Sequence, residues 1–342
     1  MKSSEESQTS GLGGLLVAVE PLQPPPPHSC LDPKGDLYIE VGMCPEQSFM
    51  VCSTTLARTA PFWDKMLYGE FKEGKKLCLQ NNNLKWTVKL PEDNPTAIAL
   101  LLNIVHSRFD KVPGYKDPLN VRDLYEISVL TDKYNITYTL QPWAKGWLPS
   151  VHRSAKRIDE SLQAQFRHER LWISWVLGDR TKFEKIAKIL LLNSCGSKGN
   201  PNSLQYAKVL EPPEIYDIIE QTRSDTIKAL LAPLHATIEG LITSDESLCT
   251  SKIWNNHSPN ICLPSMLGTY IQSLHSSVSV LSDKLKSVKI EYKGYPELGS
   301  VQNCSQGPAL RGAIDRVLCS IPSLLTKGHK RQLKSQAKKS GV

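Results

Sequence analysis

The sequence predicts an α+β domain followed by a mainly α-helical domain. Alternating apolar residues predict three short strands between residues 36 and 90, and apolar residues three and four positions apart predict helices over most of the remaining chain. A length of 342 residues also exceeds one average domain. We therefore expect a leader at 1–33, an α+β domain at 34–148, a helical domain at 149–326 and a basic, disordered tail at 327–342.

The leader and the strands follow from composition and alternation. Residues 1–33 are rich in Ser, Gly and Pro, and four consecutive prolines at 24–27 favour extended polyproline II, so we expect disorder there. Apolar residues alternate in two runs within 36–52, which predicts a hairpin with its turn at Gly42. A third strand is expected at 86–90, which completes a small three-stranded sheet with helices.

Helix starts are marked by capping residues. Ser53 opens a helical segment that restarts at Pro61. Asn94 precedes a proline at the first helical position, and Asn120 is followed three residues later by Asp123 in the manner of a capping box. A short helix is expected to carry residues 140–147.

The second half of the sequence is predicted to form helices separated by turns. An amphipathic stripe ends at Gly178 and another begins directly after it, which predicts an antiparallel helix pair. The longest helix is expected to run from Pro212 to about Ser244, with a kink or split at Pro233. Further helices are expected to begin at Pro264 and Pro308.

Several motifs of the first domain occur together in a recognisable order. Gly35-Asp36-Leu37 opens the first strand, Ala60-Pro61-Phe62 starts a helix, and LPEDNP at 90–95 precedes LYEISVLTDKYNI at 124–136. In this order and spacing the region resembles a BTB/POZ domain, and LPEDNP with PWAKGW at 142–147 resembles the BTB proteins of filamentous fungi in particular. The residues that carry the fold signature are Asp36, Leu56, Pro61, Phe62 and Met66, and the stretch from Leu56 to Met66 is expected to belong to the core.

The resemblance implies a protein-interaction module that binds other proteins and forms homodimers. BTB domains often dimerise by exchanging a segment before the first strand, but here that segment is the proline-rich leader, so a dimer through the first helix face is the alternative. In BTB proteins that recruit a cullin-type ubiquitin-ligase scaffold, a hydrophobic-x-Glu motif follows the helix pair, where Phe71 and Glu73 stand here. The alternative is that Phe71 covers the domain's own core.

The resemblance also extends to the helix pair at 168–192, which stands where cullin adaptors carry an extra helical hairpin that widens the contact. A helix pair that packs only on its own domain would have the same sequence pattern. The sequence therefore supports a substrate adaptor of a cullin-type ligase as an alternative to simple self-association.

The sequence offers no strong metal or catalytic motif. Four residues have side chains that bind zinc, namely Cys249, His257, Cys262 and His275. Their C-x7-H-x4-C spacing is not a common zinc framework, and apolar neighbours favour a packed core instead. No Walker A loop, GxSxG or HExxH motif is present, so we expect a non-catalytic protein without a cofactor.

The charge is concentrated at the C-terminus. The net charge is +7, and the tail contributes +6 of it through Lys327, Lys330, Arg331, Lys334, Lys338 and Lys339. The remainder is close to neutral, which argues against a nucleic-acid surface across the fold. The tail itself is interpreted as a nuclear import signal, a phosphate-binding arm or a solvated end, and the first of these makes a nuclear or transcriptional regulator a further alternative.

Cysteine usage and hydropathy bear on the compartment. Nine scattered cysteines without a CxxC pair fit a reducing environment. No apolar run approaches 18 residues, so no membrane partner is expected. We therefore expect an intracellular protein, cytoplasmic or nuclear or both.

Overall fold

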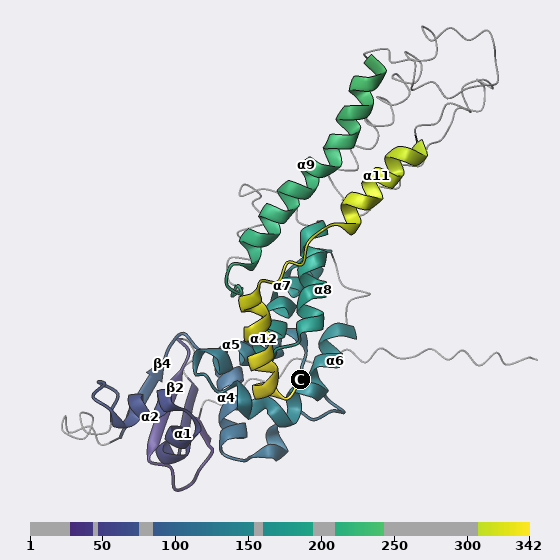
Figure 1. The fold of residues 1–342 in the computed structure, drawn as a ribbon. Coiled ribbons are helices and arrows are strands. Elements are labelled where there is room, and N and C mark those ends of the chain that lie inside the picture. The colour runs from purple at the N-terminus through teal and green to yellow at the C-terminus, as the bar shows by residue number, and fades with distance from the viewer. Residues whose placement is uncertain (1–27, 44–46, 75–84, 154–159, 194–208, 243–306) are drawn as a thin grey trace, which may run out of the picture. The chain divides into compact units, whose positions relative to one another are not determined.

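A computed structural model describes residues 28–43, 47–74, 85–153, 160–193, 209–242 and 307–342 (Figure 1). The chain forms two compact units, Met1–Arg157 and Ile158–Val342. The first holds a small sheet with helices, and the described parts of the second are helical, so the fold is of the α+β class. The division lies beyond the predicted boundary at 148, because helix α6 (Gln141–Arg153) continues through Pro149.

The predicted hairpin is confirmed. Strand β2 (Leu37–Val41) pairs antiparallel with β3 (Gln47–Val51), with Leu37 opposite Val51. Gly42 follows β2 with a φ of 82°, a conformation that favours glycine. The third predicted strand is β4 (Thr87–Leu90), which pairs in parallel with β2.

A fourth strand lies where a disordered leader was predicted. Strand β1 (His28–Cys30) pairs in parallel with β3 and completes the order β1-β3-β2-β4. The Arg108 guanidinium also donates to the Cys30 carbonyl at 2.9 Å. The prediction that order begins near residue 34 in a three-stranded sheet is therefore wrong, because backbone pairing and not side-chain alternation defines this short strand.

The described helices of the first unit are α1 (Ser53–Thr59), α2 (Pro61–Tyr68), α4 (Pro95–Val105), η1 (Phe109–Lys111), α5 (Val121–Lys133), η2 (Thr137–Leu140) and α6. Of these, α4 and α5 begin directly after the predicted capping residues, whereas α1 and α2 have no side-chain cap. The Asn94 side chain accepts from the Ala97 amide at 3.1 Å, and the Asn120 side chain accepts from the Asp123 amide at 2.9 Å. The expected capping box differs in one detail, since the Asp123 carboxylate accepts from the Asn120 side chain and not from its backbone.

The core of the first unit lies between the sheet and helices α1, α2, α4 and α5. Leu37, Ile39 and Val41 of β2 are fully buried in it. On α2 the buried residues are Trp63 and Leu67, which lie four positions apart on one helix face. Phe62 lies outside this face and is 44% exposed, so its prediction as a core residue is wrong.

The second unit contains the predicted helix pair, α7 (Glu160–Leu177) and α8 (Arg180–Asn193). Helix α9 (Ile215–Ile242) packs with α8 and with α11 (Gly307–Cys319), the helix predicted to begin at Pro308. Helix α9 is continuous through Pro233, so the predicted split does not occur; one missing hydrogen bond does not end a helix with intact turns on both sides. The helix predicted from Pro264 lies outside the described residues.

The predicted disordered tail is a helix, α12 (Lys327–Ser340), which packs on α7 and α8 (Figure 1). The Thr326 side chain caps its first turn, and Gly341 ends it with a φ of 77°. The residues that it buries are His329, Leu333, Gln336 and Ser340. The prediction failed because this buried face has only one large apolar side chain, which leaves almost no hydrophobic periodicity.

Candidate functional site

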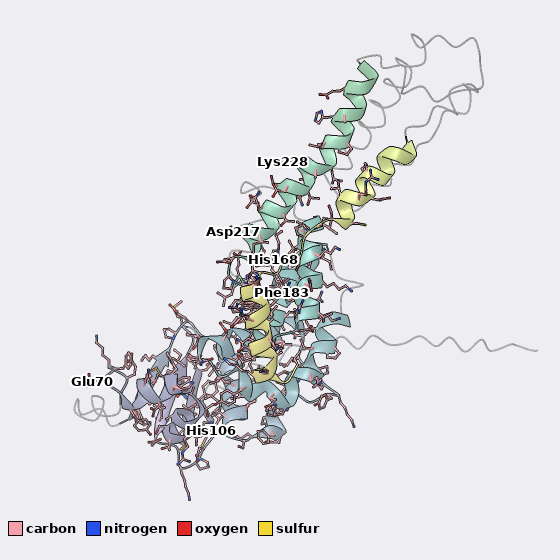
Figure 2. The ribbon with its side chains drawn as sticks, viewed as in Figure 1. Glu70, His106, His168, Phe183, Asp217 and Lys228 are labelled. Carbon is pink, nitrogen blue, oxygen red and sulfur yellow. The ribbon has the colours of Figure 1, made fainter. Side chains whose placement is uncertain are left out.

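The turn that follows α2 presents Phe71 to solvent. Phe71 is 56% exposed, next to Glu70, which Figure 2 labels. The Gly74 amide donates to the Phe71 carbonyl at 2.8 Å, and the Trp86 indole donates to the Glu73 carbonyl at 2.8 Å. The turn is therefore held to the core while its aromatic side chain points away from it, and the alternative that Phe71 covers the core is wrong.

Asp36 connects the first long strand to the helices. Its carboxylate accepts from the Ser53 amide at 2.9 Å and from the Ser53 hydroxyl at 2.8 Å. Because the Ser53 hydroxyl donates to Asp36, the Tyr68 hydroxyl donates to Ser53 at 2.6 Å. This chain of bonds fixes both the start of α1 and the end of α2, directly before the turn that carries Phe71.

The remaining signature residues divide between core and surface. Leu56 is buried, and Met66 packs partly against the core. Pro61 is exposed at the first position of α2, where a missing amide proton costs nothing. Phe62 is exposed but its ring centroid lies 5.2 Å from that of Tyr134.

Asp93, in the LPEDNP motif, joins two distant parts of the first unit. It is only 6% exposed, and its carboxylate accepts from the Tyr134 hydroxyl and from the Lys133 ammonium, the latter at 2.7 Å. Burial, followed by the charge of Asp93 and this hydrogen bond, raises the pKa of Tyr134, which remains a donor. Sequence analysis missed this group, and the only signal was a carboxylate directly before a capping Asn.

His106 stands close to Cys52 without forming a nucleophile–base pair. Its Nε2 accepts from the Cys52 amide at 3.1 Å, and its Nδ1 donates to the Leu102 carbonyl at 3.0 Å. Burial is the main cause that lowers the pKa of His106. Since both ring nitrogens bond to the backbone, neither is free to take a proton from the Cys52 thiol.

His168 links α7 to α9 in the second unit (Figure 2). The Tyr216 hydroxyl lies 2.5 Å from His168 Nδ1, and the two rings stack with centroids 5.5 Å apart. Burial, with a smaller contribution from the Arg167 charge, lowers the pKa of His168 to about 4. The imidazole is therefore neutral near pH 7, and its Nδ1 shares a hydrogen bond with the Tyr216 hydroxyl.

The four zinc candidates, Cys249, His257, Cys262 and His275, all lie outside the described residues. In the described parts of the chain no three residues of His, Cys, Asp or Glu gather as a metal site. No helix within the same ranges is both long and apolar enough to cross a membrane.

The six basic residues of the tail lie on α12. Lys327, Arg331, Lys334 and Lys338 are exposed, while Lys330 and Lys339 are half-buried. Whether an import receptor reads them stays a prediction.

Helix α12 also covers the turn end of the α7–α8 pair. A Cβ atom at Gly178 would lie 2.1 Å from the backbone nitrogen of Ala337 in α12. The Ser340 hydroxyl donates to the Leu177 carbonyl at 2.5 Å. This end of the pair is occupied within the chain, so it is not available to widen a contact with a partner.

No model of a known protein family matches the chain, and no curated protein matches it. The resemblance to BTB/POZ domains therefore depends on the motifs and remains a prediction.

Proposed function

We propose that the chain is a non-catalytic interaction protein, with a BTB/POZ domain in its first unit that self-associates and binds other proteins. The main support is the exposed Phe71 on its anchored turn. Burial of a Phe side chain stabilises by about 1.5–3 kcal/mol, so a folded domain gains nothing from holding this ring in water. Exposed aromatic anchors on rigid supports are typical of residues that dominate binding energy.

The sheet is compatible with this proposal. Strands β2 and β3 form a hairpin, β4 pairs in parallel with β2, and helices α4 and α5 follow. This order corresponds to the order of the motifs that carry the resemblance. Strand β1 occupies the sheet edge beside β3 within the same chain. A dimer that exchanges this segment would have to release three residues of pairing, so the first helix face is the simpler route to self-association.

Size-exclusion chromatography with light scattering tests self-association. We expect a mass twice that of the chain, in an equilibrium that shifts toward the monomer on dilution. A monomer at every concentration up to about 100 μM would refute a dimer of useful affinity.

The second candidate is an adaptor for a cullin-type scaffold, which the exposure of Phe71 favours. Binding is measured with the purified scaffold by isothermal titration calorimetry, using the full chain and a Phe71→Ala, Glu73→Ala double variant. Loss of a central aromatic anchor costs about 2 kcal/mol or more, so we expect affinity to fall at least about 30-fold.

Phe109→Ala is the matched control for this experiment. Phe109 has the same side chain and nearly the same exposure, 55% against 56%, but lies in η1. We expect it to bind the scaffold as tightly as the unaltered chain. The adaptor hypothesis is refuted if the unaltered chain does not bind, or if both variants lose affinity equally.

The nuclear alternative depends on the cations of α12. Deletion of the tail is not a clean test, because α12 contributes His329 and Leu333 to the packed interior of the second unit. Glutamine at the four exposed cations removes the charge and keeps the buried face. Unchanged nuclear distribution of that variant would remove the support for import through α12.

A further inference from the structure

The positive charge of the chain is concentrated on two helices that touch each other. Helices α8 and α12 are in contact, with the ring centroids of Phe183 and His329 6.5 Å apart. Together they carry ten Lys and Arg residues and one carboxylate, Glu184, which gives +9 against +7 for the whole chain. The rest of the chain is therefore at −2, and the basic character belongs to this pair of helices.

The exposed cations of α12 form a straight row. They are Lys327, Arg331, Lys334 and Lys338. Steps of four, three and four residues place them on one helix face, two positions away from the buried residues and therefore on the opposite side. Eleven residues at 1.5 Å each give the row a length of about 16 Å.

This arrangement opposes helix stability. The first turn of α12 has no acidic residue and begins with Lys327, although cations are unfavourable at the positive end of a helix dipole. Like charges four residues apart, such as Lys327 with Arg331, also destabilise a helix. Within the described parts of the chain none of the four row residues is in an ion pair. The fold does not require the row.

We propose that the α12 row, with the exposed cations of α8, binds the phosphate backbone of a nucleic-acid duplex without sequence preference. Arg180, Lys185 and Lys188 are the exposed cations of α8. One strand of a duplex has a charge every 3.4 Å, so the row spans about five phosphates. This activity belongs to the second unit and does not depend on the function proposed for the first.

The chemistry of the exposed face favours a duplex over other polyanions. Single-strand binders stack bases on aromatic side chains, and α12 has no aromatic residue except the buried His329. Helices that bind membrane surfaces insert an apolar face, whereas Leu333, the one large apolar side chain of α12, is directed into the protein. The exposed face of α12 therefore offers only positive charge, which is complementary to a linear polyanion.

The test is fluorescence anisotropy with the full chain and a labelled 20-base-pair DNA duplex of arbitrary sequence, over a range of NaCl concentrations. Seven neutralised phosphates, one for each exposed cation of α8 and α12, predict a slope of about −6.3 for log K against log[NaCl]. Replacement of the four row residues by Gln is expected to reduce the steepness by about 3.6 and the affinity at low salt by at least about tenfold. Circular dichroism of the row variant serves as the control that α12 stays helical.

A control variant removes the same charge from exposed positions of the first unit. Its four substitutions are Arg58→Gln, Lys65→Gln, Lys111→Gln and Lys116→Gln. If the α12 row binds the duplex, these four charges do not contact the phosphates. This variant is therefore expected to keep the salt slope of the unaltered chain.

Three outcomes would overturn the proposal. The first is no duplex binding at 50 mM salt, and the second is an equal loss in the row variant and the control. The third concerns the other polyanions: the same chain is titrated with a 20-nucleotide single strand and with vesicles containing phosphatidylserine. Tighter binding to either of these than to the duplex assigns the row to that partner instead.

Discussion

Substitution of Gly178 by alanine is expected to loosen α12 from the α7–α8 pair. Gly178 joins the two helices with a φ of 80°, and the backbone of α12 passes directly over it. A Cβ atom there would lie 2.1 Å from the Ala337 nitrogen and 2.6 Å from the Leu333 oxygen. Both are backbone atoms, so no side-chain rotation relieves the clash.

Two costs add at this position. A residue with a side chain in the left-handed region is less stable than glycine by about 1–2 kcal/mol. Restoration of ordinary van der Waals contact requires α12 to move by about 1 Å, and overpacking of this kind costs about 1–3 kcal/mol. The substitution should therefore destabilise the docked state of α12 by about 2–5 kcal/mol.

Hydrogen exchange of the α12 amides measures this directly. A loss of 2 kcal/mol corresponds to about 30-fold faster exchange through local opening. Gly312→Ala in α11 is the matched control, since the nearest atom to its Cβ is the Arg316 guanidinium at 4.0 Å. There alanine replaces glycine inside a helix and should stabilise it by up to about 1 kcal/mol. Unchanged protection of α12 in Gly178→Ala, or an equal loss in Gly312→Ala, would refute the assigned contact.

Two further predictions concern buried polar groups. His168 has a folded-state pKa of about 4, below its ordinary 6.5, so the unfolded chain takes up the proton first as pH falls. The contribution of neutral His168 to the free energy of unfolding is fully present above pH 6.5. It is lost as the pH falls from 6.5 to about 4, by about 3 kcal/mol in total. Urea unfolding should show this loss in the unaltered chain and not in His168→Gln, and equal pH dependence would contradict it. Asp93→Ala should destabilise the first unit by about 3 kcal/mol because Lys133 and Tyr134 lose their shared acceptor. Tyr134→Phe should cost less, and additive effects in the double variant would show that the two groups do not interact.

Local signals in the sequence explain why much of the first unit could be predicted. Alternation within 36–52 is a property of consecutive residues, and the hairpin follows from it. The capping roles of Asn94 and Asn120 require contacts only three residues away. The exposure of Phe71 could not be decided in this way, because the turn is held by a hydrogen bond from Trp86, 13 residues beyond Glu73, and no local pattern relates the two.

Contacts between distant residues account for most of what was missed. Asp93 and Tyr134 are 41 residues apart, and no periodicity relates them. Strand β1 has three residues, and only pairing with β3 distinguishes it from the leader. On α2, both Phe62 and Trp63 suit a core, and the choice between them depends on the direction in which the helix meets the sheet.

Helix α12 is the case in which terminal signals would have been better guides than hydrophobicity. Thr326 and Gly341 bracket the helix as an N-cap and a left-handed C-terminal residue, both of which the sequence contains. The basic composition between them instead suggested a solvated end. A helix whose buried face is largely polar is recognised by its caps, not by its apolar pattern.

The polar face of α12 also explains why its charges are held in a fixed row. His329 Nδ1 accepts from the Thr326 amide at 3.4 Å, which leaves the proton on Nε2 to donate to the Pro213 carbonyl at 2.9 Å. The same ring meets Trp175 edge-on at 5.6 Å, so one histidine joins α12 to α7 and to the segment before α9. The sequence argued against nucleic acid because the six cations were assigned to a disordered tail. Folding of that tail places four of them on one rigid face, which is the distribution that phosphate recognition requires.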